Sequence, residues 1–179
     1  AGSGIGAACA TALAARGCRV VVNYQHSREG ASDTVAQCQA LGVEAVSVQG
    51  SVTDNEDCQK ILDETMSTFG RLDLLVNNAG VTRFAHQKDL AALDAADFEH
   101  IMSVNVTGSY QMTRAAVPDL EKSDCGAVVN VSSHSGMSGI GSSMAYAASK
   151  GALNTMTLSL ARNLAPSIRV NAVCPGFVD

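Results

Sequence analysis

Hydrophobic positions along the chain follow two alternating patterns. Short runs rich in β-branched residues are typical of buried strands, and longer segments in which apolar residues recur every three or four positions are typical of amphipathic helices. The runs predict strands over residues 18–24, 43–49, 72–76, 127–131 and 168–173. The longer segments predict helices over residues 4–16, 27–41, 54–69, 94–120 and 144–164. Regular alternation of this kind indicates βαβ units with right-handed crossovers.

The predicted fold class is α/β, a Rossmann-type doubly wound parallel sheet flanked by helices, in a single domain over residues 1–179. The chain opens on a glycine-rich turn that normally follows a strand, and it stops just after a strand-like run. We therefore expect the first strand and a C-terminal part to be missing. Because the first strand is central in such sheets, its loss would expose two edges.

The glycine-rich turn at the start of the chain predicts a phosphate site. Gly2, Gly4 and Gly6 alternate with Ser3 and Ile5. Glycines let the backbone approach a pyrophosphate, and the following helix directs free N–H groups and its positive dipole end toward the anion. Short glycine turns also occur as ordinary tight turns, but the strand predicted one helix later favours a mononucleotide-binding unit.

The end of the second strand bears on the choice of nicotinamide cofactor. NAD-binding units carry an acidic residue there for the ribose hydroxyls, whereas this chain has Asn23 and Tyr24. The missing carboxylate permits a 2′-phosphate, and Arg28 can bind that phosphate or simply be a solvated residue at the helix start. NADP(H) is favoured and NAD(H) stays possible.

Composition narrows the class of protein further. Hydrophobic residues make up 46% and charged residues 16%, as in globular domains. The net charge of −5 argues against nucleic acid as a partner, and no apolar run reaches the roughly 18–20 residues that span a membrane. The six cysteines form no CxxC pair and no metal-binding spacing. Reduced thiols and a cytoplasmic location are expected.

Tyr146, Lys150 and Ser133 together suggest carbonyl chemistry. Tyr146 and Lys150 are four positions apart in a predicted helix and therefore share a face. An ordinary tyrosine titrates near 10, and a neighbouring ammonium favours its ionised form. Ser133 follows a strand end, where open α/β sheets bind ligands, and its hydroxyl can donate to a substrate carbonyl. Each feature alone occurs by chance, so the argument rests on their combination with the glycine-rich turn.

The order of motifs resembles the short-chain dehydrogenase/reductase family over nearly the whole chain. The matching motifs are Gly2-Ser3-Gly4-Ile5-Gly6, Asn77-Asn78-Ala79-Gly80, Asn105-Val106-Thr107-Gly108, Asn130-Val131-Ser132-Ser133, Tyr146 with Lys150, and Pro175-Gly176. The resemblance implies an NAD(P)(H)-dependent oxidoreductase that interconverts a ketone or aldehyde with an alcohol.

The same resemblance implies individual roles. Tyr146 would be the general acid/base, and Lys150 would bind the nicotinamide ribose and favour the tyrosinate. Ser133, selected over Ser132 by the family spacing to the tyrosine, would polarise the carbonyl, and Asn105 would hold a water in a proton relay. The remaining cofactor contacts would come from Asn77, Ala79, Ser51, Val52, Pro175 and Gly176.

Two positions depart from the family pattern. Ser51 stands where many members carry an Asp against the adenine, so its role there is less specific. Ser3 stands where NADP-preferring members often have a basic residue, which weakens the preference for NADP.

The substrate and the assembly are less constrained by the sequence. Residues 78–83 are similar to those of beta-ketoacyl carrier-protein reductases, but the same run occurs in relatives with other substrates. Arg83 and His134 either border the substrate pocket or are surface residues. The resemblance implies a homodimer or homotetramer through the helices over residues 94–120 and 144–164, which otherwise pack only on their own sheet.

The sequence also bears on two other classes of function. A non-catalytic nucleotide-binding or regulatory protein could keep this fold, but the intact set of Ser133, Tyr146, Lys150 and Asn105 argues against it. A serine hydrolase is excluded because the sequence contains no GxSxG motif.

Overall fold

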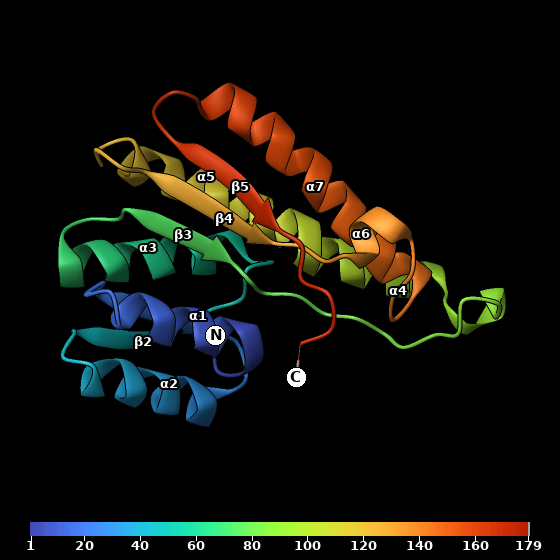
Figure 1. Cartoon of the computed structure of the whole chain (residues 1–179), viewed down its shortest axis with the longest axis horizontal. Coiled ribbons are helices and arrows are strands. Elements are labelled where there is room, and N and C mark those ends of the chain that lie inside the picture. Colours follow the sequence, from blue (N-terminus) through green and yellow to red (C-terminus); the bar gives the residue numbers. More distant parts are fainter. Residues whose placement is uncertain (179) are drawn as a thin grey trace. The chain divides into compact units, whose positions relative to one another are not determined.

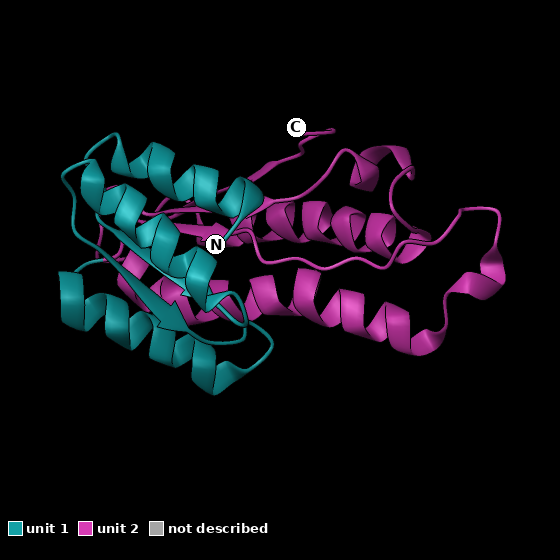
Figure 2. Ribbon diagram, turned by 90° about the horizontal axis from the view of Figure 1, so that it is seen from below, with its two compact units in different colours: residues 1–71 teal, residues 72–179 magenta. Residues whose placement is uncertain are grey.

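A computed structural model describes residues 1–178 of the chain. These residues belong to two compact units, one formed by residues 1–71 and the other by residues 72–179 (Figure 2). Each unit contains its own parallel β-sheet.

Helices and strands alternate in the first unit. They are α1 (Gly4–Ala14), β1 (Val20–Tyr24), α2 (Arg28–Ala40), β2 (Ala45–Gln49) and α3 (Asn55–Phe69) (Figure 1). β1 and β2 run parallel, from Val20 opposite Ala45 to Tyr24 opposite Gln49. The carboxyl ends of both strands therefore lie at the same edge of this sheet.

Small side chains allow close packing in the core of the first unit. Val22, Ala31 and Cys38 are completely buried. A Cβ atom added to Gly2 would lie 2.9 Å from the Ala31 nitrogen, and one added to Gly30 would lie 2.1 Å from the Gly2 oxygen. The start of α1 thus packs against the first turn of α2 with backbone on backbone.

The second unit contains a three-stranded sheet and the longest helix. Its elements are β3 (Leu74–Asn77), the 3₁₀-helix η1 (Leu90–Ala92), α4 (Ala95–Met102), the π-helix η2 (Ser103–Gly108), α5 (Ser109–Leu120), β4 (Ala127–Val131), α6 (Ser135–Ser138), α7 (Met144–Leu164) and β5 (Arg169–Val173). The strands pair in parallel in the order β3-β4-β5. α5 packs on β3 and β4, and α7 packs on β5 (Figure 1).

The predicted alternation of parallel strands and helices is confirmed, with two differences in detail. The helix predicted over residues 94–120 is divided into α4, η2 and α5, and α6 and η1 lie in segments expected to be loops. The strands of residues 1–178 form two sheets, β1-β2 and β3-β4-β5, which is the arrangement expected when the central strand is absent.

Two further observations concern the whole described chain. No helix within residues 1–178 combines the length and the apolarity needed to cross a membrane. The six cysteines, all of which lie in this range, are joined by no disulfide bond.

Candidate active site

The first turns of α7 carry Tyr146 and Lys150. Ser143 caps the helix, because its Oγ accepts a hydrogen bond from the Tyr146 nitrogen at 3.2 Å. Tyr146 is half-buried, whereas only 4% of Lys150 is exposed. The Lys150 Nζ lies 5.7 Å from the centre of the Tyr146 ring. The predicted pairing of phenol and amine on one helix face is present in the structure.

Burial makes Lys150 an unusual amine. Its Nζ donates a hydrogen bond of 2.7 Å to the Val131 oxygen, at the end of β4. Desolvation lowers the pKa of the Lys150 ammonium from 10.5 to about 8, partly opposed by its electrostatic interaction with Cys174. Lys150 therefore stays mostly protonated at neutral pH but loses its proton more easily than an exposed lysine.

The two serines that follow β4 have different surroundings. Ser132 is buried, and its Oγ donates to the Lys150 oxygen at 3.1 Å. Ser133 is half-buried, and its Oγ donates to the Ser135 Oγ at 3.1 Å while accepting from the Ser135 nitrogen at 3.1 Å. Ser132 is thus tied to α7 inside the protein, and Ser133 keeps the more accessible hydroxyl.

A backbone contact brings the segment after Ser133 onto α7. A Cβ atom added to Gly136, in α6, would lie 2.5 Å from the Lys150 carbonyl carbon and 2.7 Å from the Gly151 nitrogen. Only glycine permits so close an approach between α6 and α7. This contact fixes the loop that carries Ser133 against the turn that carries Lys150.

Asn105 lies in the π-helix η2 and is completely buried. Its Oδ1 accepts from the Val81 nitrogen at 2.8 Å, and its Nδ2 donates to the Val81 oxygen at 3.0 Å. A Cβ atom added to Gly80 would lie 3.4 Å from the Asn105 Oδ1 and 3.6 Å from the Lys150 Nζ. The loop after β3, the π-helix and α7 therefore meet around Gly80.

Asn77 is placed inside the second unit. Its Nδ2 donates to the Asn130 Oδ1 at 2.9 Å and to the Thr113 Oγ1 at 3.0 Å, and it lies 3.3 Å from the Ser109 oxygen. Asn77, which the resemblance places in the cofactor groove, uses its side-chain amide in this buried network. Ala79, two positions further along, is exposed.

The turn before α1 has the geometry of an anion site. Gly4 adopts a φ of +54°, in the left-handed region that glycine alone adopts easily. Ser3 stands at the N-cap of α1, and its side chain forms no hydrogen bond with the first N–H groups of the helix. Gly6 is buried within α1, and Ile5 is half-buried.

The other residues predicted to bind the cofactor in the first unit differ in their exposure and in their partners. The Asn23 Nδ2 donates to the Val48 oxygen at 3.2 Å and to the Gly50 oxygen at 3.0 Å, which ties the ends of β1 and β2 together. Arg28 is exposed at the start of α2. The Ser51 nitrogen donates to the Asp57 Oδ2 at 2.8 Å, and Ser51 and Val52 are half-buried.

Further polar residues near the second sheet have partners of their own. The Arg83 Nη1 contacts both carboxylate oxygens of Asp97, at 2.6 and 2.5 Å. The Pro175 oxygen accepts from the His134 nitrogen at 2.9 Å, and the His134 Nδ1 lies 3.3 Å from the Ser138 Oγ. Gly176, which follows Pro175, is exposed. Because Asp97 lies in the first turn of α4, the contact between Arg83 and Asp97 ties the loop after β3 to the start of that helix.

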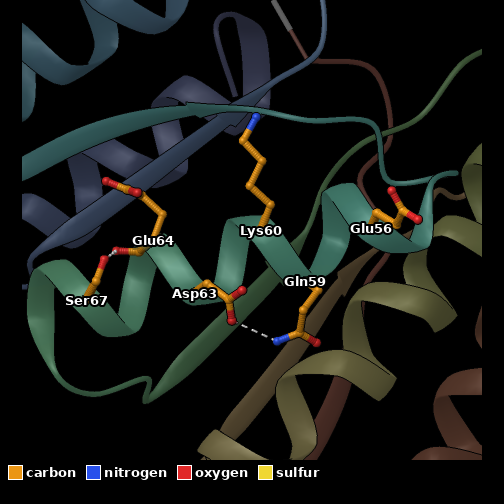
Figure 3. Close-up of a pocket in the computed structure, with 6 residues that line it drawn as sticks. All are labelled: Glu56, Gln59, Lys60, Asp63, Glu64 and Ser67. Atoms are coloured by element: carbon orange, nitrogen blue, oxygen red, sulfur yellow. Dashed lines mark hydrogen bonds between the residues drawn. The ribbon is translucent and has the colours of Figure 1, made fainter.

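A separate shallow pocket lies on the outer face of α3 (Figure 3). It is lined by Glu56, Gln59, Lys60, Asp63, Glu64 and Ser67. The Gln59 Nε2 donates to the Asp63 Oδ1 at 2.9 Å, and the Lys60 Nζ donates to the Gln49 oxygen at 3.2 Å. These contacts are those of a solvated helix face.

Among residues 1–178, no cluster of three His, Cys, Asp or Glu side chains could hold a metal ion.

The family model for short chain dehydrogenases matches residues 1–179. The chain belongs to the short-chain dehydrogenase/reductase family. The Rossmann-type α/β class predicted from the sequence is confirmed by this match and by solved structures of family members. Members of the family are oxidoreductases that use NAD(P)(H) and act on small molecules.

The matches to individual relatives cover nearly all of this chain and about two thirds or more of each relative. A Streptomyces violaceoruber protein assigned as ketoacyl reductase 2 of the granaticin polyketide synthase is 44% identical over 177 residues, which cover 99% of the chain and 70% of the relative. The 3-oxoacyl-(acyl-carrier-protein) reductase of a Synechocystis species is 38% identical over 176 residues, which cover 98% and 70%. The crystal structure of an NAD⁺-bound xylitol dehydrogenase matches with a TM-score of 0.92 and 33% identity, covering 98% and 67%.

Sequence reasoning missed three residues that build the site. Ser149, Ser135 and Gly136 carry no motif of their own that a sequence pattern would single out. Their importance comes from contacts with Asn105, Ser133 and Lys150, which the fold brings together. The only signal in the sequence is the run of small residues on both sides of Tyr146.

Proposed function

We propose that the protein interconverts a ketone or aldehyde with an alcohol, using NADP(H) or NAD(H), with Tyr146 as the general acid/base. One observation carries the proposal: Lys150 is buried beside the Tyr146 ring, at 5.7 Å, while a backbone contact at Gly136 holds the Ser133 loop against the same turn of α7. A buried cation next to a partly exposed phenol is suited to proton transfer.

The proposed chemistry divides the work among the residues of α7 and the Ser133 loop. A reduced nicotinamide, when bound, supplies a hydride to the carbonyl carbon. Tyr146 gives its hydroxyl proton to the carbonyl oxygen, and the protonated Lys150 stabilises the resulting tyrosinate. Ser133 leaves its hydrogen bond with Ser135 and donates to the same carbonyl oxygen. In the alcohol-oxidising direction, the tyrosinate takes the proton back.

Asn105 is proposed to support the return of the proton. The π-helix η2 breaks the regular hydrogen bonding between α4 and α5 at this residue. In the proposal, Asn105 accepts a hydrogen bond from a water that connects the Lys150 amine to solvent, since both Nδ2 hydrogens are already donated. Lys150 keeps two N–H groups beyond the one that it donates to Val131. These groups are available for a ribose hydroxyl and for that water.

The residues of the first unit fit a dinucleotide pyrophosphate. The uncapped start of α1, the left-handed Gly4 and the close packing of Gly2 on α2 form the kind of turn in which backbone N–H groups bind phosphate. We assign Gly2 to Gly6 to the pyrophosphate and Ser51 and Val52 to the adenosine. In the second unit, Lys150, Tyr146, Ala79, Pro175 and Gly176 are assigned to the nicotinamide half.

NADP(H) is the proposed preference. The exposed Arg28 guanidinium at the start of α2 forms no ion pair with an acidic side chain of residues 1–178, and Asn23 stands where NAD-binding units carry a carboxylate. A 2′-phosphate would gain a charge-assisted hydrogen bond from Arg28. The likeness to an NAD⁺-bound dehydrogenase keeps NAD(H) as the alternative.

The substrate proposed is a neutral or acyl-linked ketone, on the strength of the two ketoacyl reductases among the relatives.

The protein is also proposed to form a homodimer or homotetramer through α4, α5 and α7. Tyr110 and Leu158, on α5 and α7, expose 45% and 60% of their surface. Large side chains so exposed on both of these helices fit a contact with a second copy.

The proposed function is tested by following the oxidation of NADPH and of NADH when a 3-oxoacyl thioester or a simple diketone is added. We expect ketone-dependent oxidation of NADPH, and weaker activity with NADH. Equal or tighter binding of NADH in a direct titration would contradict the NADP preference. A protein that binds both nucleotides but turns over neither with any ketone would contradict the oxidoreductase activity itself.

A further inference from the structure

Ser149 stands between Tyr146 and Lys150, and the mechanism above gives it no part. Its side chain is completely buried. The Ser149 Oγ donates a hydrogen bond of 2.7 Å to the backbone carbonyl oxygen of Tyr146 and accepts one of 2.9 Å from the Asn105 Nδ2. A single hydroxyl thus joins the turn that carries the phenol to the π-helix that carries Asn105.

The Asn105 amide has no donor to spare. One Nδ2 hydrogen goes to the Val81 oxygen and the other to Ser149, while the Oδ1 accepts from the Val81 nitrogen. Val81 follows Gly80, whose α-carbon faces the Lys150 Nζ closely enough that an added Cβ would lie 3.6 Å away. A continuous path of hydrogen bonds therefore runs from the Tyr146 backbone through Ser149 and Asn105 to this loop.

Removing the Ser149 hydroxyl would break this path at its centre. A buried N–H group without an acceptor is unfavourable, so the Asn105 amide would turn to find another partner. Such a rotation also disturbs its two bonds to Val81, because all three bonds share one planar group. The loop beside Lys150 would then lose the contact that fixes it.

We propose that Ser149 is a positioning residue for the reaction: it keeps the Tyr146–Lys150 turn in register with Asn105 and the Gly80–Val81 loop. The inference rests on the proposed function for its effect on turnover, but not for its effect on the loop. Ser149 acts through Asn105 and the Tyr146 backbone.

The chain offers a matched control on the same helix. Thr157 is also buried in α7, its Oγ1 donates to the Leu153 oxygen at 2.7 Å, and it accepts from the Nδ2 of a buried asparagine, Asn130, at 2.8 Å. Ser149→Ala and Thr157→Val therefore each remove a buried hydroxyl that accepts from an asparagine amide. Only the first lies in the Tyr146–Lys150 turn.

Kinetics of the two variants separate positioning from general destabilisation. We expect both to lower the melting temperature, but only Ser149→Ala to lower kcat, by about tenfold, with the KM for NADPH changed by less than about twofold. Ser149→Ala with a kcat within about twofold of Thr157→Val would overturn the proposal. If Ser149→Ala does not fold, Ser149→Cys keeps the volume with a weaker hydrogen bond, and a kcat equal to that of the unmodified protein would overturn it equally.

Hydrogen exchange measures the same coupling without turnover. In the cofactor-free protein, Ser149→Ala should raise the exchange rate of the Val81 amide by about tenfold, and Thr157→Val should leave it unchanged. Unchanged exchange at Val81 in Ser149→Ala contradicts the inference. If the unmodified protein has no ketone reductase activity, the proposed function fails, and the exchange result alone decides whether Ser149 holds the loop.

Discussion

At the scale of single residues, the site depends on a cation that the fold keeps away from water. Lys150 is 4% exposed and its pKa is lowered to about 8 by burial. The unfolded chain returns the amine to its usual value of 10.5. Between these values the unfolded state binds more protons than the folded state, so stability rises with pH. Below pH 8, burial of the protonated Lys150 amine lowers the free energy of unfolding by its full amount, about 3 kcal/mol at ~1.4 kcal/mol per pKa unit.

Replacing Lys150 with Met tests whether burial of this amine makes the free energy of unfolding depend on pH. Met has a similar length and no charge, so the part of the pH dependence that belongs to Lys150 should disappear. In urea unfolding between pH 7.5 and 10.5, the unmodified protein should gain about 1–3 kcal/mol relative to Lys150→Met. Because other titrating groups are shared by both proteins, the difference between the two curves isolates Lys150. Parallel curves would mean that the amine is not buried in the folded state.

Several site residues could be predicted from the sequence, and others could not. The pairing of Tyr146 with Lys150 follows from their spacing on one helix. The partners of Asn77 do not follow from spacing, because Asn130 and Thr113 lie on other elements, far along the chain. Sequence alone cannot tell whether an amide points to a ligand or into a buried network, since both environments favour the same residue type.

At the scale of elements, the main surprise is the π-helix within the predicted long helix. The hydrophobic pattern over residues 94–120 is continuous, and a single wide turn changes it too little to be detected. At this point the Asn105 amide pairs with both backbone groups of Val81, which is distant in the sequence. The helix accommodates that pairing by widening at η2.

The contact between α6 and α7 leads to a prediction at this scale. An alanine at Gly136 would place its Cβ 2.5 Å from the Lys150 carbonyl carbon, so α6 would have to move away from α7. We expect Gly136→Ala to lower the free energy of unfolding by about 2 kcal/mol and to reduce turnover, since Ser133 lies on the displaced segment. Thermal unfolding followed by circular dichroism measures the first effect.

Gly176 provides the control for stability. A Cβ atom added there meets no atom within 4 Å. Gly176→Ala should therefore change the melting temperature little, because it introduces no clash. Equal melting temperatures for the two alanine variants would show that α6 does not pack on α7 through Gly136.

At the scale of the whole molecule, the sequence predicted the α/β class, the parallel strands and two exposed edges, but not which strands pair. Within residues 1–178, β1 pairs with β2, and β3, β4 and β5 form a second sheet. Hydrophobic pattern identifies a strand but not its neighbour, because every buried parallel strand carries the same β-branched run. The pattern alone therefore does not give the pairing of β1 with β2 or the order β3-β4-β5.

The proposed assembly gives a prediction at this scale. Leu158 exposes 60% of its surface on α7. Placed in a contact between two copies, a charge there would be desolvated, so Leu158→Glu should shift the protein from a dimer or tetramer toward the monomer at micromolar concentration. Light scattering coupled to size exclusion gives the mass directly.

Leu41 is a matched control for this experiment. It is 50% exposed at the end of α2, outside the helices proposed to form the contact. Leu41→Glu should leave the measured mass unchanged. An unchanged mass for Leu158→Glu, or the same loss of mass in both variants, would contradict an interface through α7.

The central claim, that Tyr146 transfers the proton during carbonyl reduction, is tested most directly by Tyr146→Phe. This variant removes one hydroxyl and keeps the ring that packs beside Lys150. In a single-turnover experiment with saturating NADPH and ketone, the rate of NADPH oxidation should fall by about a thousandfold or more, while the Kd for NADPH stays within about threefold of the unmodified value. Turnover by Tyr146→Phe within about tenfold of the unmodified rate would contradict the claim.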